Sequence, residues 1–217
     1  KIVKLPVSDF GMPKFEIKIR WILIAILLPC IIKGIYVLIF NGEYVSSNMN
    51  GNEIFNTLSA GVAFTGIAAG FVEEMVFRGV ILNALKKRWN MKVAVIVPSM
   101  LFGIVHVLGQ DFSIGSCLLV IIAGTMVGVM FSMIAIESGS VWNSGIVHAI
   151  WNIVIIGGGL AIGEKMDPYS VMTYVLDSKV FAITGGEFGI ESSVISLIGY
   201  IIVAGIAFIM IKSNRKN

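Results

Sequence analysis

The sequence predicts an all-α fold: a polytopic transmembrane helical bundle of about six spans, with both termini in the cytoplasm. Of its 217 residues, 57% are hydrophobic and 13% are charged, whereas a soluble domain has roughly 45–50% apolar and about 25% charged residues. The apolar residues lie in long runs, and a bilayer span needs about 20 of them. Basic and acidic connections alternate between these runs. Together these observations predict an integral membrane protein.

Six segments have the length and polarity expected of a span. No separate soluble domain and no internal repeat is evident, so the chain is predicted to be a single domain, 1–217. The second span is longer than one crossing needs, and the third is short and contains Pro98. No small-residue cleavage site follows the first span, which favours an anchor over a signal peptide. The predicted spans are 21–40, 55–85, 93–108, 114–136, 141–162 and 194–211.

The connections between spans predict the orientation. Lys and Arg are enriched on the cytoplasmic flanks of membrane helices. Basic residues cluster before the first span, between the second and third, and after the last, while connections 41–53, 109–113 and 163–193 carry an excess of acids. The connection 137–140 is too short to be informative. This alternation predicts that both termini are cytoplasmic.

The stretch `FVEEMVFRG`, residues 71–79, places three charges inside the second predicted span. A charge at the bilayer centre costs about 2.5–3.5 kcal/mol on insertion scales, so these side chains should face the bundle interior. Glu74 and Arg78 are four residues apart and can pair on one helix face. A structural and a catalytic role are both open for Glu74. Glu73 has no basic residue at this spacing, which makes a purely structural role harder to explain.

The only two histidines, His106 and His148, also lie in predicted spans, and Asn152 follows His148 by one turn. Ionisable residues inside a membrane indicate function by default. At 1.5 Å per residue, Glu73, His106 and Asn152 lie about 18–21 Å, and His148 about 12 Å, from the cytoplasmic ends of their helices. The four side chains can therefore meet in one polar cavity near mid-membrane.

Two pairs of glycines indicate close helix packing around this cavity. Gly66 and Gly70 precede Glu73, and Gly124 and Gly128 lie in the fourth predicted span. Small residues four apart let helix backbones approach closely in lipid. We therefore expect the helices that carry these pairs to touch their neighbours.

Three motifs occur in order on separate spans: `EEMVFR` as EExxxR, `FGIVH` as FxxxH and `HAIWN` as HxxxN. Together they resemble the CAAX-protease and bacteriocin-processing family, also called the Abi family, whose eukaryotic branch contains the type II CAAX prenyl endopeptidases. The resemblance covers roughly residues 70–155, within a motif-bearing core of about 55–162. The first and last spans match nothing specific.

The resemblance implies an intramembrane peptide hydrolase with a defined set of site residues. Glu73 would be the carboxylate that activates water, and His106 its partner or a metal ligand. His148 and Asn152 would complete the site, as a ligand and as a hydrogen-bond donor to the oxyanion. The supporting pair would be Glu74 and Arg78. The implied catalytic residues are Glu73, Glu74, Arg78, His106, His148 and Asn152.

Metal dependence is open at this point. His106 and His148 are candidate zinc ligands, because two histidines and a glutamate can hold Zn²⁺ in the open form that metalloproteases use. Asparagine is a poor zinc ligand, however, and no HExxH sequence occurs. The family is described both as metalloproteases and as glutamate-dependent enzymes. The resemblance therefore implies the metalloprotease class, with Zn²⁺ as a possible cofactor and metal-free glutamate catalysis as the alternative; no organic cofactor is expected.

The expected partners are membrane lipid and a peptide or protein substrate that is itself membrane-associated, such as a prenylated-type peptide or a bacteriocin. No nucleic-acid partner is expected. The brevity of the chain favours a bacterial plasma membrane. Which substrate is cleaved, and whether a prenyl group is recognised, is not encoded in any motif of the sequence.

Other functions remain as alternatives. A serine protease could use Ser144 with His106, but the GxSG context is missing, and no Asp lies in any predicted span to support an aspartyl protease. A proton-coupled transporter could use membrane Glu and His residues, but the repeats or broken helices common in transporters are not seen. A non-catalytic immunity or interaction protein is also compatible, since fold does not fix function.

Overall fold

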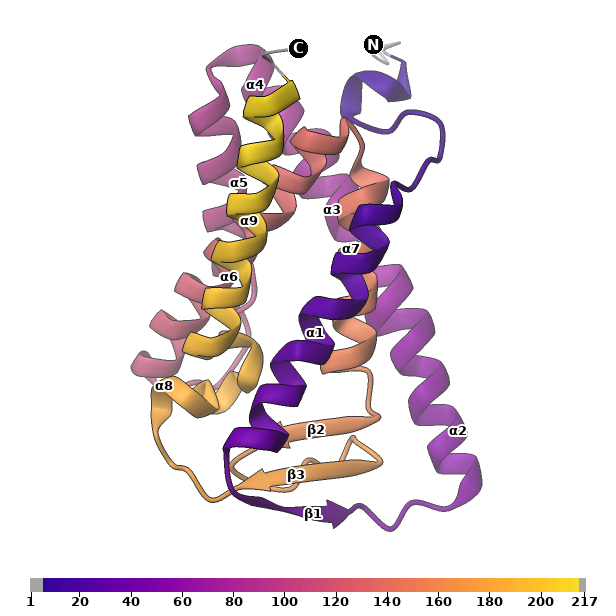
Figure 1. The fold of residues 1–217 in the computed structure, drawn as a ribbon, viewed down its shortest axis with the longest axis vertical. Helices are drawn as coiled ribbons and strands as arrows, with labels where there is room; N and C mark the ends of the chain where they lie inside the picture. The colour runs from indigo at the N-terminus through magenta and orange to yellow at the C-terminus, as the bar shows by residue number, and fades with distance from the viewer. Residues whose placement is uncertain (1–5, 215–217) are drawn as a thin grey trace.

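Long apolar helices form the body of the molecule in the computed structural model, which describes residues 6–214 (Figure 1). Helices account for 71% of the chain. Four helical segments of the described part are long and apolar enough to cross a membrane, and two apolar helices are shorter. The long segments are α1 (Ile19–Ile39), the continuous segment Gly51–Arg88, α6 (Ile114–Ser138) and α9 (Val194–Asn214); the shorter helices are α5 (Met91–Val105) and α7 (Val141–Ile155).

The segment Gly51–Arg88 changes its hydrogen-bond pattern along its length. Two π-helical stretches interrupt the α-helix on either side of Glu73 and Glu74. In order, the pieces are α2 (Gly51–Ala60), the π-helix η2 (Gly61–Ala68), α3 (Ala69–Glu74), the π-helix η3 (Met75–Ile81) and α4 (Leu82–Arg88). π-helical turns are rare and occur frequently at functional sites.

A three-stranded sheet shows that the predicted all-α class was incomplete. Its strand order is β1-β3-β2, with β1 (Gly42–Ser46) antiparallel and β2 (Leu160–Gly163) parallel to the central β3 (Met172–Leu176). β1 and β3 come from the two acidic connections 41–53 and 163–193, for which the sequence predicted no strands. They pair because Tyr44 and Tyr174 lie directly opposite, with ring centroids 4.8 Å apart, and such cross-strand pairs stabilise sheets.

Two predicted spans also end earlier than expected. The span predicted for 141–162 stops at Ile155, because Gly158 adopts a left-handed backbone with φ of +81° and the chain then enters β2. The span predicted for 93–108 stops at Val105, so that His106 is the C-cap of α5. Both changes move a predicted site residue closer to a helix end.

The charged connections separate in space as the sequence predicted. The first 3₁₀ helix, η1 (Val7–Phe10), the basic helix α4 and the C-terminal part of α9 lie at one end of the molecule, and the sheet lies at the other (Figure 1). The short elements α8 (Phe181–Thr184), η4 (Gly186–Phe188) and η5 (Ile190–Ser192) precede α9 on the sheet side. Which end faces the cytoplasm remains a prediction.

The predicted glycine contacts are confirmed. A Cβ on Gly70 would lie 2.8 Å from the backbone nitrogen of Ala149 in α7, and one on Gly66 would lie 2.3 Å from the side chain of Ile153. A Cβ on Gly124 would lie 2.6 Å from the Cα of Gly103 in α5. Only glycine allows these approaches. As a result η2 and α3 pack tightly against α7, and α6 packs tightly against α5.

Both ends of α7 are held by polar contacts, which fixes the helix that carries His148 and Asn152. At its N-terminal end, the backbone N–H of Val141 donates to the carbonyl of Gly11 at 2.9 Å. At its C-terminal end, the ammonium group of Lys33, which comes from α1, donates to the carbonyls of Val154 and Leu160. Helix carbonyls at this position lack partners within the helix. Lys33 therefore faces the bundle interior and caps α7.

Candidate active site

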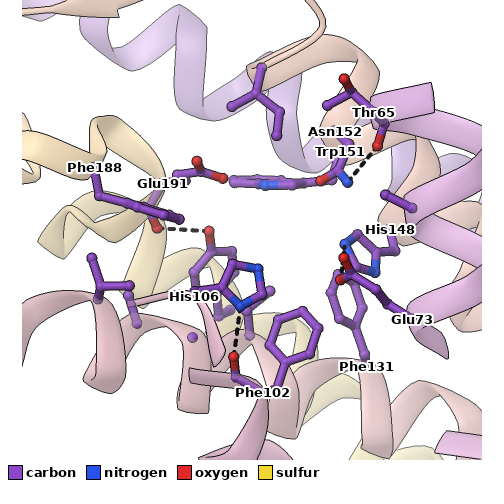
Figure 2. Close-up of a pocket in the computed structure, with 17 residues that line it drawn as sticks. Thr65, Glu73, Phe102, His106, Phe131, His148, Trp151, Asn152, Phe188 and Glu191 are labelled. Atoms are coloured by element: carbon purple, nitrogen blue, oxygen red, sulfur yellow. Dashed lines mark hydrogen bonds and ion pairs between the residues drawn. The ribbon is translucent and has the colours of Figure 1, made fainter. Parts of the chain in front are cut away.

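Four of the six predicted site residues line one cavity of about 160 Å³: Glu73, His106, His148 and Asn152 (Figure 2). Glu73, His148 and Asn152 lie on one side, which we call the glutamate wall. His106 lies on the opposite side with Phe188 and Glu191, which we call the Phe188 wall. The hydroxyl of Tyr200 is bonded to the backbone of Glu191. The other two predicted residues, Glu74 and Arg78, are buried behind the glutamate wall.

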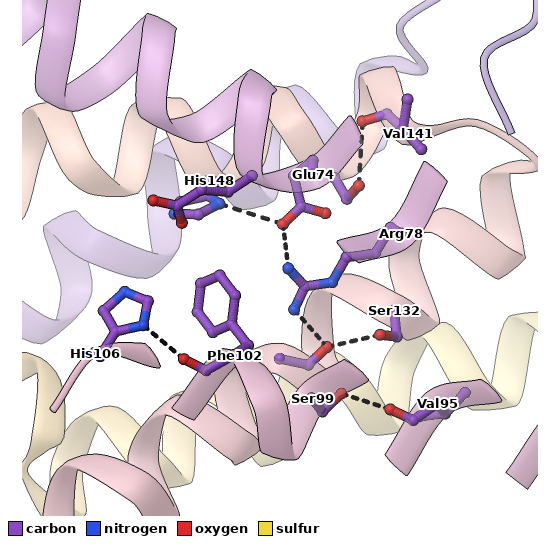
Figure 3. A network of polar contacts seen from close by, with 12 residues as sticks. Glu74, Arg78, Val95, Ser99, Phe102, His106, Ser132, Val141 and His148 are labelled. Atoms are coloured by element: carbon purple, nitrogen blue, oxygen red, sulfur yellow. Dashed lines mark hydrogen bonds and ion pairs between the residues drawn. The ribbon is translucent and has the colours of Figure 1, made fainter. Parts of the chain in front are cut away.

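The predicted pairing of Glu74 with Arg78 is confirmed (Figure 3). The two side chains are fully buried, and Nη1 of Arg78 donates to Oε1 of Glu74 at 2.7 Å. Nη2 of Arg78 donates to the carbonyl of Gly128 in α6 at 2.9 Å, and the guanidinium carbon lies 4.6 Å from the centre of the Phe102 ring. An ion pair this deep is stable only because hydrogen bonds replace the lost water. It joins the first motif to α5 and α6.

His148 lies between the two neighbouring glutamates. Its Nδ1 is 3.2 Å from Oε1 of Glu74, and its Nε2 is 3.8 Å from Oε2 of Glu73. The imidazole stacks on Phe131, with ring centroids 4.5 Å apart. A proton on Nδ1 is accepted by Glu74, which leaves the lone pair of Nε2 facing Glu73 and the cavity. The sequence suggested His106 as the partner of Glu73, but the structure places His148 beside it.

Glu73 differs from Glu74 in its exposure. The side chain of Glu73 is 34% exposed, whereas that of Glu74 is completely buried. The 3.8 Å separation from His148 is longer than a direct hydrogen bond. Glu73 therefore has room for a water molecule, while Glu74 is committed to Arg78 and His148.

His106 is held by the end of its own helix. Its Nδ1 lies 2.7 Å from the carbonyl oxygen of Phe102, one turn earlier, so this nitrogen carries the proton that the carbonyl accepts. Carbonyls in the last turn of a helix lack partners within it, which gives the FxxxH spacing a local cause. The other nitrogen, Nε2, faces the cavity (Figure 2).

Asn152 is oriented by the first π-helical stretch. Its Nδ2 donates one hydrogen to the carbonyl of Thr65 in η2 at 2.9 Å. An asparagine amide has two hydrogens on this nitrogen, so one remains for a ligand. Thr65 was not predicted, because nothing in the apolar sequence around it indicates an interrupted helix.

Several residues of the cavity were missed because they belong to no motif. Phe188 and Glu191 come from η4 and η5 in the connection 163–193, and Tyr200 comes from the last span. The hydroxyl of Tyr200 donates to the carbonyl of Glu191 at 2.9 Å. Burial raises the pKa of Glu191 to about 7, against a smaller opposing effect from the nearby indole N–H of Trp151. The one feature of the sequence that could have indicated a site residue here is the acid Glu191, placed three residues before the predicted span 194–211.

The arrangement does not fit the three-ligand zinc site that the sequence left open. Within residues 6–214, no group of three or more His, Cys, Asp or Glu side chains is placed to share a metal ion. His106 and His148 lie on opposite walls. The hydrogen bond at each Nδ1 leaves Nε2 free and is itself compatible with a metal ligand, so the misfit lies in the separation of the histidines and the lack of a shared third ligand in the described part of the chain. Zinc binding by these two histidines remains a prediction without geometric support.

Comparisons with known proteins bear on the same segment. Residues 55–154 match the family model described as Type II CAAX prenyl endopeptidase Rce1-like. No curated protein and no solved structure matches the chain. The matched segment contains all six predicted site residues but neither Phe188 nor Glu191. This family implies CAAX-type peptidase activity in an integral membrane protein. Through residues 55–154, the chain is similar to the CAAX-protease family that its three motifs resemble.

Proposed function

We propose that the protein is an intramembrane endopeptidase that hydrolyses a peptide bond in this cavity, with Glu73 as the general base. The observation that carries the proposal is the position of Glu73: a partly exposed carboxylate, 3.8 Å from Nε2 of a histidine that buried Glu74 and Arg78 hold in place. A partly exposed carboxylate beside a positioned imidazole can bind a water molecule on the cavity side of both.

In the proposed reaction, Glu73 takes a proton from this water as its oxygen attacks the carbonyl carbon of the scissile bond. Nε2 of His148 accepts the second hydrogen bond of the water and orients it. As the tetrahedral intermediate collapses, the carbon–nitrogen bond breaks and Glu73 returns the proton to the leaving amine. General acid–base catalysis of this kind contributes about 10²–10⁴-fold to a rate.

The oxyanion of the intermediate needs a donor that is already in place. The free Nδ2 hydrogen of Asn152 supplies it, because the carbonyl of Thr65 fixes the amide orientation. His106 faces the same space from the Phe188 wall with an unprotonated Nε2, which can accept a hydrogen bond from water or from the substrate amide. The six residues thus have separate roles: base, water-orienting imidazole, oxyanion donor, second acceptor and the buried supporting pair.

The decisive experiment compares the wild-type protein with Glu73→Gln in proteoliposomes. The substrates are a prenylated CAAX peptide and an unprenylated membrane-associated peptide, with cleavage followed by mass spectrometry. Glutamine preserves shape and removes the base, so we expect turnover to fall at least about 10²-fold. Glu43→Gln, on exposed strand β1, is the matched control and should cleave as the wild type does. Equal turnover by wild type and Glu73→Gln would remove Glu73 as the general base, whereas no cleavage by the wild type would favour a non-catalytic immunity or interaction protein.

Metal dependence is tested separately with the same assay. Because the proposal uses no metal, a strong chelator should leave turnover within about twofold of the untreated enzyme. If the histidines hold Zn²⁺ instead, chelation should abolish cleavage and added zinc should restore it. Elemental analysis of the purified protein provides an independent reading, because a stoichiometric metal would contradict the metal-free reaction.

The class of substrate follows from the position of the cavity within the helices. We propose a peptide or protein that is membrane-associated, of the prenylated or bacteriocin type, with surrounding lipid as the other partner. A bacterial plasma membrane and cytoplasmic termini are proposed from chain length and charge distribution. Labelling of single cysteines introduced at Ser8 and Glu43 would test the orientation, because these residues lie at opposite ends of the molecule.

A further inference from the structure

A second, larger cavity of about 750 Å³ lies on the sheet side of the candidate active site. We call it the vestibule. It is lined by β2, by the connection that follows β2, and by η4 and η5. Three residues line both cavities: Ile156, Phe188 and Glu191. These residues lie between the two spaces, and we call them the neck; a peptide that extends from the vestibule to Glu73 would pass them.

Most carboxylates of the vestibule already have neutral hydrogen-bond donors. Glu164 accepts from the hydroxyl of Thr184 at 2.6 Å, and Glu187 accepts from the backbone N–H of Ser113 at 2.8 Å. Asp167 likewise accepts from Ser170. Lys165 also lines the vestibule and partly offsets their charge. These acids are structural parts of the loops and do not by themselves indicate a ligand.

Glu191 differs from these acids in its position, because it is half-buried in the neck, where it lines both cavities. The indole N–H of Trp151 is its neutral donor, and no cation lies within 4 Å of it among residues 6–214. The other carboxylate that lines the candidate active site, Glu73, has a histidine within 4 Å. Within residues 6–214, the buried carboxylates of Glu74 and Glu137 likewise have a basic side chain within 4 Å. Glu191 has no such ion pair in that range, although its backbone is fixed by Tyr200. A carboxylate withdrawn from water without a positive partner is costly. Burial accordingly raises its pKa to about 7.

We propose that Glu191 is a specificity-determining residue that binds a cationic group of the substrate in the neck. The group would be a Lys or Arg side chain, or a free amino terminus, on a peptide that extends from the vestibule to Glu73. This inference rests on the proposed function for its meaning, because the cation is recognised on a substrate. The glutamate wall on the opposite side provides the catalytic residues, and Glu191 determines which peptides bind.

Binding of defined peptides tests the inference without requiring cleavage. The probes are short fluorescein-labelled peptides in which one Lys moves along an otherwise neutral, membrane-associating sequence; norleucine replaces Lys in the parent. Affinities are measured by fluorescence anisotropy in detergent at about pH 8, in a Glu73→Gln background that prevents hydrolysis. We expect the best Lys peptide to bind roughly tenfold more tightly than the parent, as a charge-assisted hydrogen bond gives.

Two variants then locate the effect. Glu191→Gln should reduce this tenfold ratio to about one, whereas the matched change Glu187→Gln in the vestibule should preserve it. Equal ratios in all three proteins, or no preference for Lys at any position, would overturn the inference. Tighter binding of a Glu peptide would also overturn it, by showing a protonated Glu191 that donates to an anion. Selective binding without any cleavage by the wild type would contradict the proposed function and leave this inference intact.

The pH dependence gives a second reading with a defined sign. Glu191 is ionised above its pKa of about 7 and neutral below it, so the preference for Lys should be present at about pH 8.5 and lost by about pH 5.5. Other charged or titratable groups line the two cavities around it: Tyr200, Glu73, His106 and His148 on one side, and Lys165, Glu164, Asp167 and Glu187 on the other. These groups are unchanged in Glu191→Gln, so the preference for Lys measured in that variant at each pH gives their contribution separately from that of Glu191. An identical pH profile in this variant would contradict the proposal.

Discussion

The two walls of the candidate active site differ in how their polar groups are satisfied. On the glutamate wall, His148 is bonded to Glu74, Glu74 to Arg78, and Asn152 to Thr65, so these side chains are held in place by the chain itself. On the Phe188 wall, an imidazole and a carboxylate face the cavity beside aromatic rings. The first wall is preorganised for a reaction, and the second has polar groups left for a substrate.

The largest effect expected on the glutamate wall is on stability. Arg78→Met would leave the buried carboxylate of Glu74 without its cation, and breaking one side of a buried pair typically costs about 3–5 kcal/mol. Thermal unfolding in detergent measures this loss. Glu74→Gln/Arg78→Met removes both charges, so it should be less destabilised than Arg78→Met. Unchanged unfolding in Arg78→Met, or a double variant no more stable than that single variant, would show that the pair does not support the wall.

The next effect distinguishes the two histidines. Because Nε2 of His148 lies 3.8 Å from Glu73 and no contact joins His106 to Glu73 among the described residues, His148→Gln should reduce kcat about 10²-fold. His106→Gln, the matched change on the other wall, should reduce kcat by a smaller factor. Equal and complete inactivation by both changes, together with sensitivity to chelator, would instead indicate a shared metal ion.

Local spacing explains what the sequence could predict of this site. Glu74 and Arg78 are one helical turn apart, and His148 and Asn152 likewise, so their shared faces follow from helix geometry alone. The charge of `FVEEMVFRG` in an apolar run indicated that these side chains face inward, and they do. The glycine pairs of the second and fourth predicted spans were similarly readable, because close approach needs small residues at a fixed interval.

Contacts between distant segments explain what could not be predicted. Whether Glu73 meets His106 or His148 depends on how three helices pack, which no spacing within one helix determines. The π-helical stretches shift hydrogen bonds by one residue without changing the apolar composition. The sheet arises from pairing Tyr44 with Tyr174, far apart in the chain. Glu191 reaches the cavity only because η4 and η5 fold back over it.

A moderate effect should follow from disturbing the packing behind the glutamate wall. A Cβ on Gly70 would lie 2.8 Å from the backbone of Ala149, next to His148, and overpacking of this kind costs about 1–3 kcal/mol. We expect Gly70→Ala to unfold at lower temperature and to lose activity through displacement of His148. Gly205→Ala on α9, where no atom lies within 4 Å, should be neutral. Equal stability of the two variants would argue against close packing of α3 on α7.

The smallest effect is expected on the Phe188 wall. The Phe188 ring makes edge-to-face contacts with His106 and Phe112, each with centroids 6.1 Å apart, and aromatic pairs contribute about 0.5–1.5 kcal/mol. Phe188→Ala should therefore raise KM by roughly two- to tenfold, with a smaller change in kcat, because the neck is widened while Glu73 and His148 stay in place. Phe55→Ala, at an exposed position on α2, should leave both constants near wild type. A fall in kcat as large as that of His148→Gln would place Phe188 in the chemistry and remove the distinction between the two walls.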